Sequence, residues 1–253
     1  MNLLASLSGW LGKNSGPGSD GFNRLLVEHA GLGMLKQIVL AQRVPGDITQ
    51  CDCDMDRGLL ILGDGFKARP QMIGSGSAEK NSWLWPWANR LLGPPLKYQQ
   101  DVLQLKALGE EQGIPEFTSK ELQFGSRLQA EHLALIAAGI CGRHGLVRTS
   151  STLVYGTVHS WFTLSDVLPL TAAECHAGNL VAAIRRAAAC CPVNQRRMVE
   201  HFFSQLELAA QPEPEALVAS LPEGGTLRLS FDRKERISAI SLDGQSVPVA
   251  APQ

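Results

Sequence analysis

The stretch SWLWPWANR, residues 82–90, contains three of the five tryptophans in this 253-residue chain. If the stretch were a strand, Trp83, Trp85 and Trp87 would lie on one face and form a stacking platform. Pro86 favours a short helix instead, because proline is tolerated in the first helical turn, where its missing N–H needs no partner. Such a helix carries indoles on two sides, so it can bury them only as a wedge between a sheet and longer helices.

Two interpretations of these tryptophans stay open. In the first they fill the core, to which each buried indole would contribute roughly 150–250 Å² of surface removed from water. In the second they line a ligand site, and Asn89 supplies an amide that can donate and accept hydrogen bonds. Aromatic clusters belong to the core more often, so packing is the leading interpretation. Under the second, the candidate ligand-binding residues are Trp83, Trp85, Trp87 and Asn89.

The segments on both sides of the tryptophans have recognisable periodicities. Apolar residues three and four positions apart predict helices over residues 22–43, 98–112, 122–141, 171–191 and 193–208. Alternating runs joined by glycine-containing turns predict three strands of an antiparallel meander, over residues 47–55, 59–66 and 68–75. The glycines of residues 74–77 read as a turn that leads into the tryptophans, and QPEPE, residues 211–215, reads as a surface connector.

The end of the chain predicts a hairpin. TLRLSF, residues 226–231, and RISAISL, residues 236–242, alternate apolar and polar side chains. Two strands alone are not stable, so we expect the hairpin to join the earlier sheet. The prediction is therefore a single α+β domain in which an antiparallel sheet is packed on one side by several helices.

Three parts of the chain are distinguished by composition. Residues 1–19 hold a short amphipathic helix followed by a flexible linker, residues 20–243 the α+β domain, and residues 244–253 a tail. The amphipathic pattern at the start consists of Leu3, Leu4, Leu7, Trp10 and Leu11. This helix either docks on a partner or a membrane surface, or it folds back on its own domain or frays. The second is favoured because short isolated helices are marginal in water.

Composition limits the classes of function. A net charge of −1 lacks the surplus of cations that a nucleic-acid partner requires. The chain start has no basic region typical of a signal peptide, and no run approaches the 18 apolar residues of a transmembrane helix. Six cysteines are too few for a disulfide scaffold. We expect a cytoplasmic protein with free thiols and no nucleic-acid or membrane-spanning role.

The run QMIGSGSAEKNSWLWPWAN, residues 71–89, resembles the signature of an uncharacterised bacterial protein family with a W-x-W-x-W-A-N segment. The likeness continues around Gly109-Glu110 and to FDRKERI, residues 231–237, so it covers roughly residues 20–243. Pro86 stands where the family pattern has alanine. The resemblance implies a single α+β domain and no particular activity, cofactor or catalytic residue.

No constellation of reactive residues predicts a catalytic, metal or cofactor site. Cys51-Asp52-Cys53-Asp54 would need a second ligand pair from elsewhere to hold zinc. The glycines near residue 75 lack the spacing of a phosphate-binding loop. Residues 146–164 read as extended structure, so the neighbours His159 and Ser160 point to opposite faces, which disfavours a triad with Asp166.

The leading functional hypothesis is a non-catalytic binding or protein-interaction module with a protein partner, by analogy of the immunity type. The alternative is a small hydrolase-like enzyme with a pocket beside the tryptophans. Its candidate groups are His159, Asp166, Asp52 and Asp54. The sequence leaves the oligomeric state open.

Overall fold

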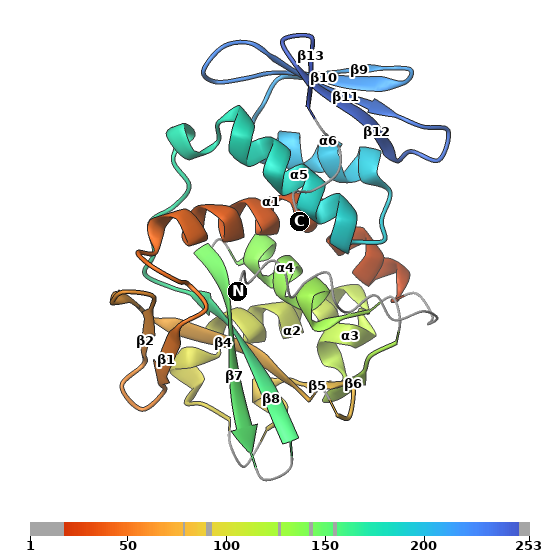
Figure 1. Ribbon diagram of the computed structural model, residues 1–253. Helices are drawn as coiled ribbons and strands as arrows, with labels where there is room; N and C mark the ends of the chain where they lie inside the picture. Colours follow the sequence, from red (N-terminus) through yellow and green to blue (C-terminus); the bar gives the residue numbers. More distant parts are fainter. Residues whose placement is uncertain are drawn as a thin grey trace.

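The computed structural model describes residues 18–77, 79–89, 93–125, 128–141, 144–153 and 156–247, with the backbone alone for 144–147, 149–153 and 156. These residues form six α-helices and three antiparallel sheets, arranged in layers around a central helix (Figure 1). The predicted α+β class is confirmed, although three sheets replace the single one that we expected. None of the described helices is long and apolar enough to cross a bilayer.

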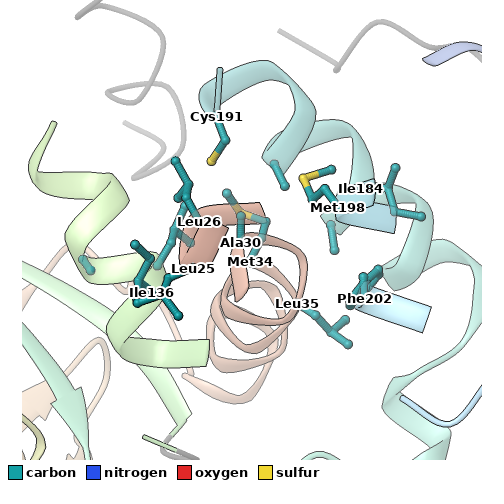
Figure 2. Close-up of a cluster of buried hydrophobic side chains, with 14 of the residues drawn as sticks. Leu25, Leu26, Ala30, Met34, Leu35, Ile136, Ile184, Cys191, Met198 and Phe202 are labelled. Carbon is teal, nitrogen blue, oxygen red and sulfur yellow. The ribbon is translucent and has the colours of Figure 1, made fainter. Parts of the chain in front are cut away.

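Helix α1 is the central element. It packs against α4 on one side and against α5 and α6 on the other (Figure 2). Glycines permit this crowding: a β-carbon on Gly33 would overlap the carbonyl oxygen of Leu135 on α4. The helices are α1 (Asp20–Arg43), α2 (Gln100–Gln112), α3 (Pro115–Thr118), α4 (Ala130–Ile140), α5 (Ala177–Cys190) and α6 (Gln195–Gln205).

Two of the three sheets lie below α1 in Figure 1: sheet A, formed by strands β1 to β3, and sheet B, formed by strands β4 to β8. Side chains of β8 alternate between two cores: Trp161 packs with the helices, whereas Phe162 and Leu164 pack with sheet A. Sheet A is a meander of β1 (Cys51–Asp54), β2 (Leu59–Leu62) and β3 (Phe66–Ala68). Sheet B has the order β6 (Glu121–Gln123), β5 (Ser82–Leu84), β4 (Pro70–Ser77), β8 (Gly156–Leu164) and β7 (His144–Leu153).

Sheet C covers α5 and α6 at the top of Figure 1. Leu227, Leu229 and Phe231 are buried on its inner face, whereas Arg228 between them is exposed, as the alternation in TLRLSF predicts. Its order is β13 (Gln245–Val247), β12 (Ile237–Leu242), β11 (Thr226–Phe231), β10 (Ala216–Ser220) and β9 (Ala210–Glu213).

Several predictions of local structure are wrong. The terminal hairpin does not join the meander, because β9, β10 and β13 complete a separate sheet around it. QPEPE is therefore largely the edge strand β9, and residues 74–77 belong to strand β4. The predicted helix 122–141 is confined to α4, because residues 121–123 pair with β5 as strand β6.

The predicted division into residues 1–19, 20–243 and 244–253 stays a prediction. Residues 1–17, which carry the expected amphipathic helix, lie outside the described residues. Residues 245–247, which we assigned to the tail, form strand β13. Helix α1 begins at Asp20 with Ser19 as its N-cap, two residues before the start of the predicted range 22–43.

Candidate binding cleft at the start of helix α1

The tryptophan stretch is divided between strand β5 and the 3₁₀ turn η2 (Pro86–Ala88), which replaces the predicted helix. Trp83 and Trp85 have no exposed surface, and their rings meet edge to face with centroids 5.4 Å apart. Trp83 also contacts the ring of Trp161 at 5.2 Å. The Gly74 position makes this possible, because a β-carbon there would overlap the Trp83 indole. These two rings fill the core, as the leading interpretation holds.

Trp87 and Asn89 lie nearer the surface. The Nζ atom of Lys106 lies 5.1 Å from the centre of the half-buried Trp87 ring, which is a cation–π contact. The Trp85 indole N–H donates to the carbonyl of Glu116, whereas the buried indole N–H groups of Trp83 and Trp87 have no acceptor among the described residues. A ligand cannot stack on Trp83 or Trp85 as they lie. The assignment of the four residues as ligand-binding stays a prediction.

The groups of the hydrolase alternative are not brought together. His159 lies beside Trp161 on β8, and burial, followed by the charge of Arg148, lowers the pKa of His159. Asp166 follows the far end of the same strand, about 23 Å further along the chain, and accepts a hydrogen bond from the Arg69 N–H. Asp52 and Asp54 lie on β1 in sheet A.

Four of the six cysteines lie in two pairs that are close in sequence, Cys51 with Cys53 and Cys190 with Cys191. Cys51 and Cys53 both pack against the core of sheet A, because alternate residues of a strand lie on the same face. Burial is the main cause that raises their pKa values, to about 12 and about 11, so both stay protonated thiols at neutral pH. Across the described part of the chain, no three His, Cys, Asp or Glu residues gather in a way that could hold a metal ion.

A cleft of about 200 Å³ opens where α1 begins. Three separate segments line it: the first two turns of α1, Leu128 just before α4, and the connection between α5 and α6. None of the described residues that line it is ionisable, and its surface is divided about evenly between polar and apolar atoms, so the cleft can receive an apolar group that also meets hydrogen-bonding atoms. The lining residues are Gly18, Phe22, Asn23, Leu26, Val27, Leu128, Pro192, Val193 and Asn194.

The floor of the cleft is fixed by the N-cap of α1. The Ser19 hydroxyl accepts a hydrogen bond from the Phe22 N–H, which satisfies one of the free donors at the helix start. Glu116, on α3, accepts hydrogen bonds from the Ser19 N–H at 2.5 Å and its hydroxyl at 2.6 Å. The Asn23 side-chain amide donates to the Gly18 carbonyl. The helix start is thus anchored to a second helix.

The two walls are tied together by His132 of α4, which is 2% exposed. Its Nδ1 atom accepts from the Gln129 N–H at 3.3 Å, and its Nε2 atom lies 2.9 Å from the carbonyl oxygen of Cys190. A carbonyl only accepts, so Nε2 carries the proton and the ring is neutral. This bridge joins the segment before α4 to the end of α5, from which the Pro192 wall continues.

The cleft carries little sequence signal. Its lining residues are ordinary core types from three distant segments, and only Pro192 stands out in the sequence, as a helix breaker. Sequence patterns report what a segment does locally, whereas a hollow arises where three segments meet and fail to fill the space between them. Periodicity therefore identified these positions as packing residues and missed the cleft.

A model of a protein family described as a family of unknown function (DUF6882) matches residues 23–167. The matched region includes most of α1, sheets A and B and the helices α2, α3 and α4, and it ends before α5, α6 and sheet C. Comparison with curated proteins and with solved structures gives no match. Because the matched region is more than half of the chain, the protein belongs to the DUF6882 family, as the resemblance to an uncharacterised family anticipated.

Proposed function

We propose that the protein is a non-catalytic protein-interaction module whose contact surface is the cleft at the start of α1. The observation that carries this proposal is the composition of the cleft: about 200 Å³ lined by apolar side chains and two asparagine amides. An apolar cavity of roughly 150 Å³ is large enough to bind benzene, so this cleft has room for one large apolar side chain. A partner that inserts one leucine, methionine or aromatic residue fits it.

The rim supplies polar complementarity to such a partner. Asn194 caps α6 with its side-chain oxygen, which accepts from the Arg197 N–H at 2.9 Å. Its exposed amide group is positioned to donate to the backbone carbonyl of an incoming segment. In most protein interfaces a few buried anchor residues contribute most of the binding energy, and the contacts around them are polar.

Two narrower statements belong to the same proposal. An immunity-type role would make the partner an effector protein encoded beside this chain, and identification of that neighbouring gene would test it. A cytoplasmic location is supported by the six cysteines, all of which are free thiols.

The test uses three half-buried valines changed to aspartate. Val27 and Val193 line the cleft, and Val218 on β10 of sheet C is the matched control. Full-length protein and the three variants are used to isolate a partner from the native cells. The affinity of the purified partner is then measured by calorimetry. Because a charge facing the cleft must be desolvated, Val27→Asp and Val193→Asp should weaken binding about tenfold or more.

Val218→Asp should bind the partner as the unchanged protein does. Equal binding by all four proteins, or loss of binding in Val218→Asp alone, would show that the contact surface lies elsewhere. Circular dichroism of each variant separates a loss of binding from a loss of folding. If the unchanged chain retains no partner, the interaction proposal itself is rejected.

A further inference from the structure

Cys190 and Cys191 are adjacent in sequence and their sulfur atoms lie 3.5 Å apart. Cys190 is the last residue of α5 and is half-buried, whereas Cys191 is 2% exposed and caps the helix by donating its N–H to the Ala187 carbonyl. The sulfur of Cys191 points towards Leu26 and Ala30 of α1 (Figure 2). The pair therefore lies at the junction of α5, α1 and the cleft.

The backbone carbonyls of the two cysteines are hydrogen-bonded to the cleft wall and to α4. The Val193 N–H donates to the Cys191 carbonyl at 2.9 Å, and the Cys190 carbonyl accepts from His132. Asn194, two residues beyond Pro192, is the N-cap of α6. Any change in the backbone between residues 190 and 191 is thus transmitted directly to Pro192, Val193 and Asn194, which line the cleft.

We propose that Cys190 and Cys191 are a redox-modification site, where a peroxide forms a vicinal disulfide that displaces the Pro192–Asn194 wall of the cleft. In the first step the Cys190 sulfur attacks the peroxide O–O bond and becomes a sulfenic acid, releasing water from hydrogen peroxide. In the second step the Cys191 sulfur displaces hydroxide from that sulfenic acid, forming the S–S bond and a second water. Two thiols are oxidised, losing two protons and two electrons, and one peroxide is reduced.

Accessibility determines the order of these steps. Cys190 is half-buried and can meet a small oxidant, whereas Cys191 is enclosed. The hydrogen bond with Cys190, followed by burial, raises the pKa of the Cys191 thiol well above its usual range, so Cys191 is a poor first nucleophile. Once Cys190 is a sulfenic acid, its proximity to Cys191 compensates for that low reactivity.

Ring closure must move the backbone. A disulfide requires sulfur atoms about 2.05 Å apart, so the pair has to close by about 1.5 Å from its present separation. Adjacent α-carbons are about 3.8 Å apart, below the usual range for disulfides, so the bond is strained. Strained disulfides are readily reduced, which makes the modification reversible by a thiol reductant.

Trypsin provides a direct assay with an internal control. Cleavage after Arg186 and Arg196 gives a peptide, residues 187–196, whose only cysteines are Cys190 and Cys191. Cleavage after Arg43 and Arg57 gives residues 44–57, which contain Cys51 and Cys53. The α-carbons of that second pair are two strand positions apart, about 6.6 Å, at the upper limit of the range for disulfides, so this peptide controls for unselective oxidation. The folded, full-length protein is treated with hydrogen peroxide, alkylated, digested and analysed by mass spectrometry.

We expect the 187–196 peptide to lose two hydrogens and to resist alkylation until a reductant is added, while residues 44–57 carry two alkyl groups. A 187–196 peptide that stays doubly alkylated, or that accumulates sulfinic acid on Cys190 without a disulfide, would overturn the proposal. In Cys191→Ser, a sulfenic acid on Cys190 should be trapped by dimedone. In Cys190→Ser, Cys191 should stay reduced.

Movement of the wall is measured by hydrogen exchange of the oxidised protein. The Arg197 amide, which the Asn194 cap protects, should exchange roughly fivefold faster, the factor expected from loss of one helix cap. Unchanged exchange would overturn the proposed displacement of the Pro192–Asn194 wall. Only the expected loss of partner binding after oxidation rests on the proposed function, and the mass spectrum stands independently of it.

Discussion

The tryptophan cluster is apolar and close-packed, whereas the cleft is hollow and exposes polar and apolar surface in similar amounts. Around Trp83 and Trp85, the indoles are in contact with each other and with Trp161, and Gly74 leaves room for a ring directly above the strand. At the start of α1, Phe22 and Leu26 border about 200 Å³ that no described side chain fills. The region with the densest aromatic signal is therefore the least able to receive a ligand.

The two regions should respond differently to amino-acid substitution. A close-packed cluster has no spare volume, so an added methyl group must displace an aromatic ring. A cleft already exposes its lining, so substitutions there disturb binding more than folding.

The largest effect should come from one methyl group in strand β4. Gly74→Ala places a β-carbon on the Trp83 indole, whereas Gly76→Ala, on the same face, meets the Trp161 ring at 3.1 Å. We expect Gly74→Ala to lower the free energy of unfolding by about 3 kcal/mol or more and Gly76→Ala by about 1 kcal/mol. Urea unfolding followed by tryptophan fluorescence measures both. Equal effects would show that the cluster has room to adjust.

Acid should destabilise the helical side of the molecule through His29 of α1. Burial, followed by the charges of Lys36 and His201, lowers its pKa from 6.5 to about 4. The stability that depends on neutral His29 is fully present above pH 6.5 and is lost as the pH falls from 6.5 to 4, by up to about 3 kcal/mol. Urea unfolding between these pH values measures the loss.

His29→Gln should remove most of this pH dependence. The pKa of His159 is also lowered, so that residue contributes in the same direction and His159→Gln is the control. Glu174, whose pKa the hydrogen bond from Arg43 lowers to about 2, acts below pH 4.5 and leaves the upper part of the window to the histidines. An unchanged pH dependence in His29→Gln would contradict the assignment.

A smaller effect should follow from removing the cap that forms the floor of the cleft. Ser19→Ala deletes the acceptor for the Phe22 N–H and leaves Glu116 with a single hydrogen-bond donor from Ser19. We expect a loss of about 1 kcal/mol, and faster amide exchange in the first turn of α1. Exchange near Trp83 should stay as it was. Uniformly faster exchange would mean that the two regions unfold together.

The smallest effect is expected at the edge of the tryptophan stretch. Trp87→Phe keeps an aromatic ring under Lys106 and should change stability by about 0.5 kcal/mol or less. Trp83→Phe, by contrast, leaves a cavity and should cost about 2 kcal/mol. Comparable losses would show that Trp87 is as much a core residue as Trp83.

The sequence predicted the elements better than their assembly. Periodicity located α1 and α2 within two residues, because their apolar stripes are long and Gly113 ends α2 in a left-handed conformation. It misplaced the terminal hairpin, since nothing in TLRLSF says which other strands pair with it. Strands such as β6 are too short to show alternation, and pairing with β5 alone decides their structure.

The candidate site was less predictable than the fold. Burial of Trp83 and Trp85 followed from the general tendency of aromatic clusters to form cores, although Gly74 was interpreted as a turn residue. The hollow beside Phe22 depends on the distances between three segments, and no local pattern encodes such distances. The hydrogen-bond bridge through His132 could not be predicted from the sequence either, because a lone histidine in a helix has no sequence signature.

The central position of α1 has a practical consequence for anyone who works with the family-matched portion alone. Met34 and Leu35 of α1 lie against Met198, Ile184 and Phe202, which belong to α5 and α6 (Figure 2). A polypeptide cut after residue 167 would retain the helix and lose that cover. The apolar face of α1 that α5 and α6 normally cover would then be exposed, which would make the fragment prone to self-association. The full chain is therefore the appropriate unit for purification.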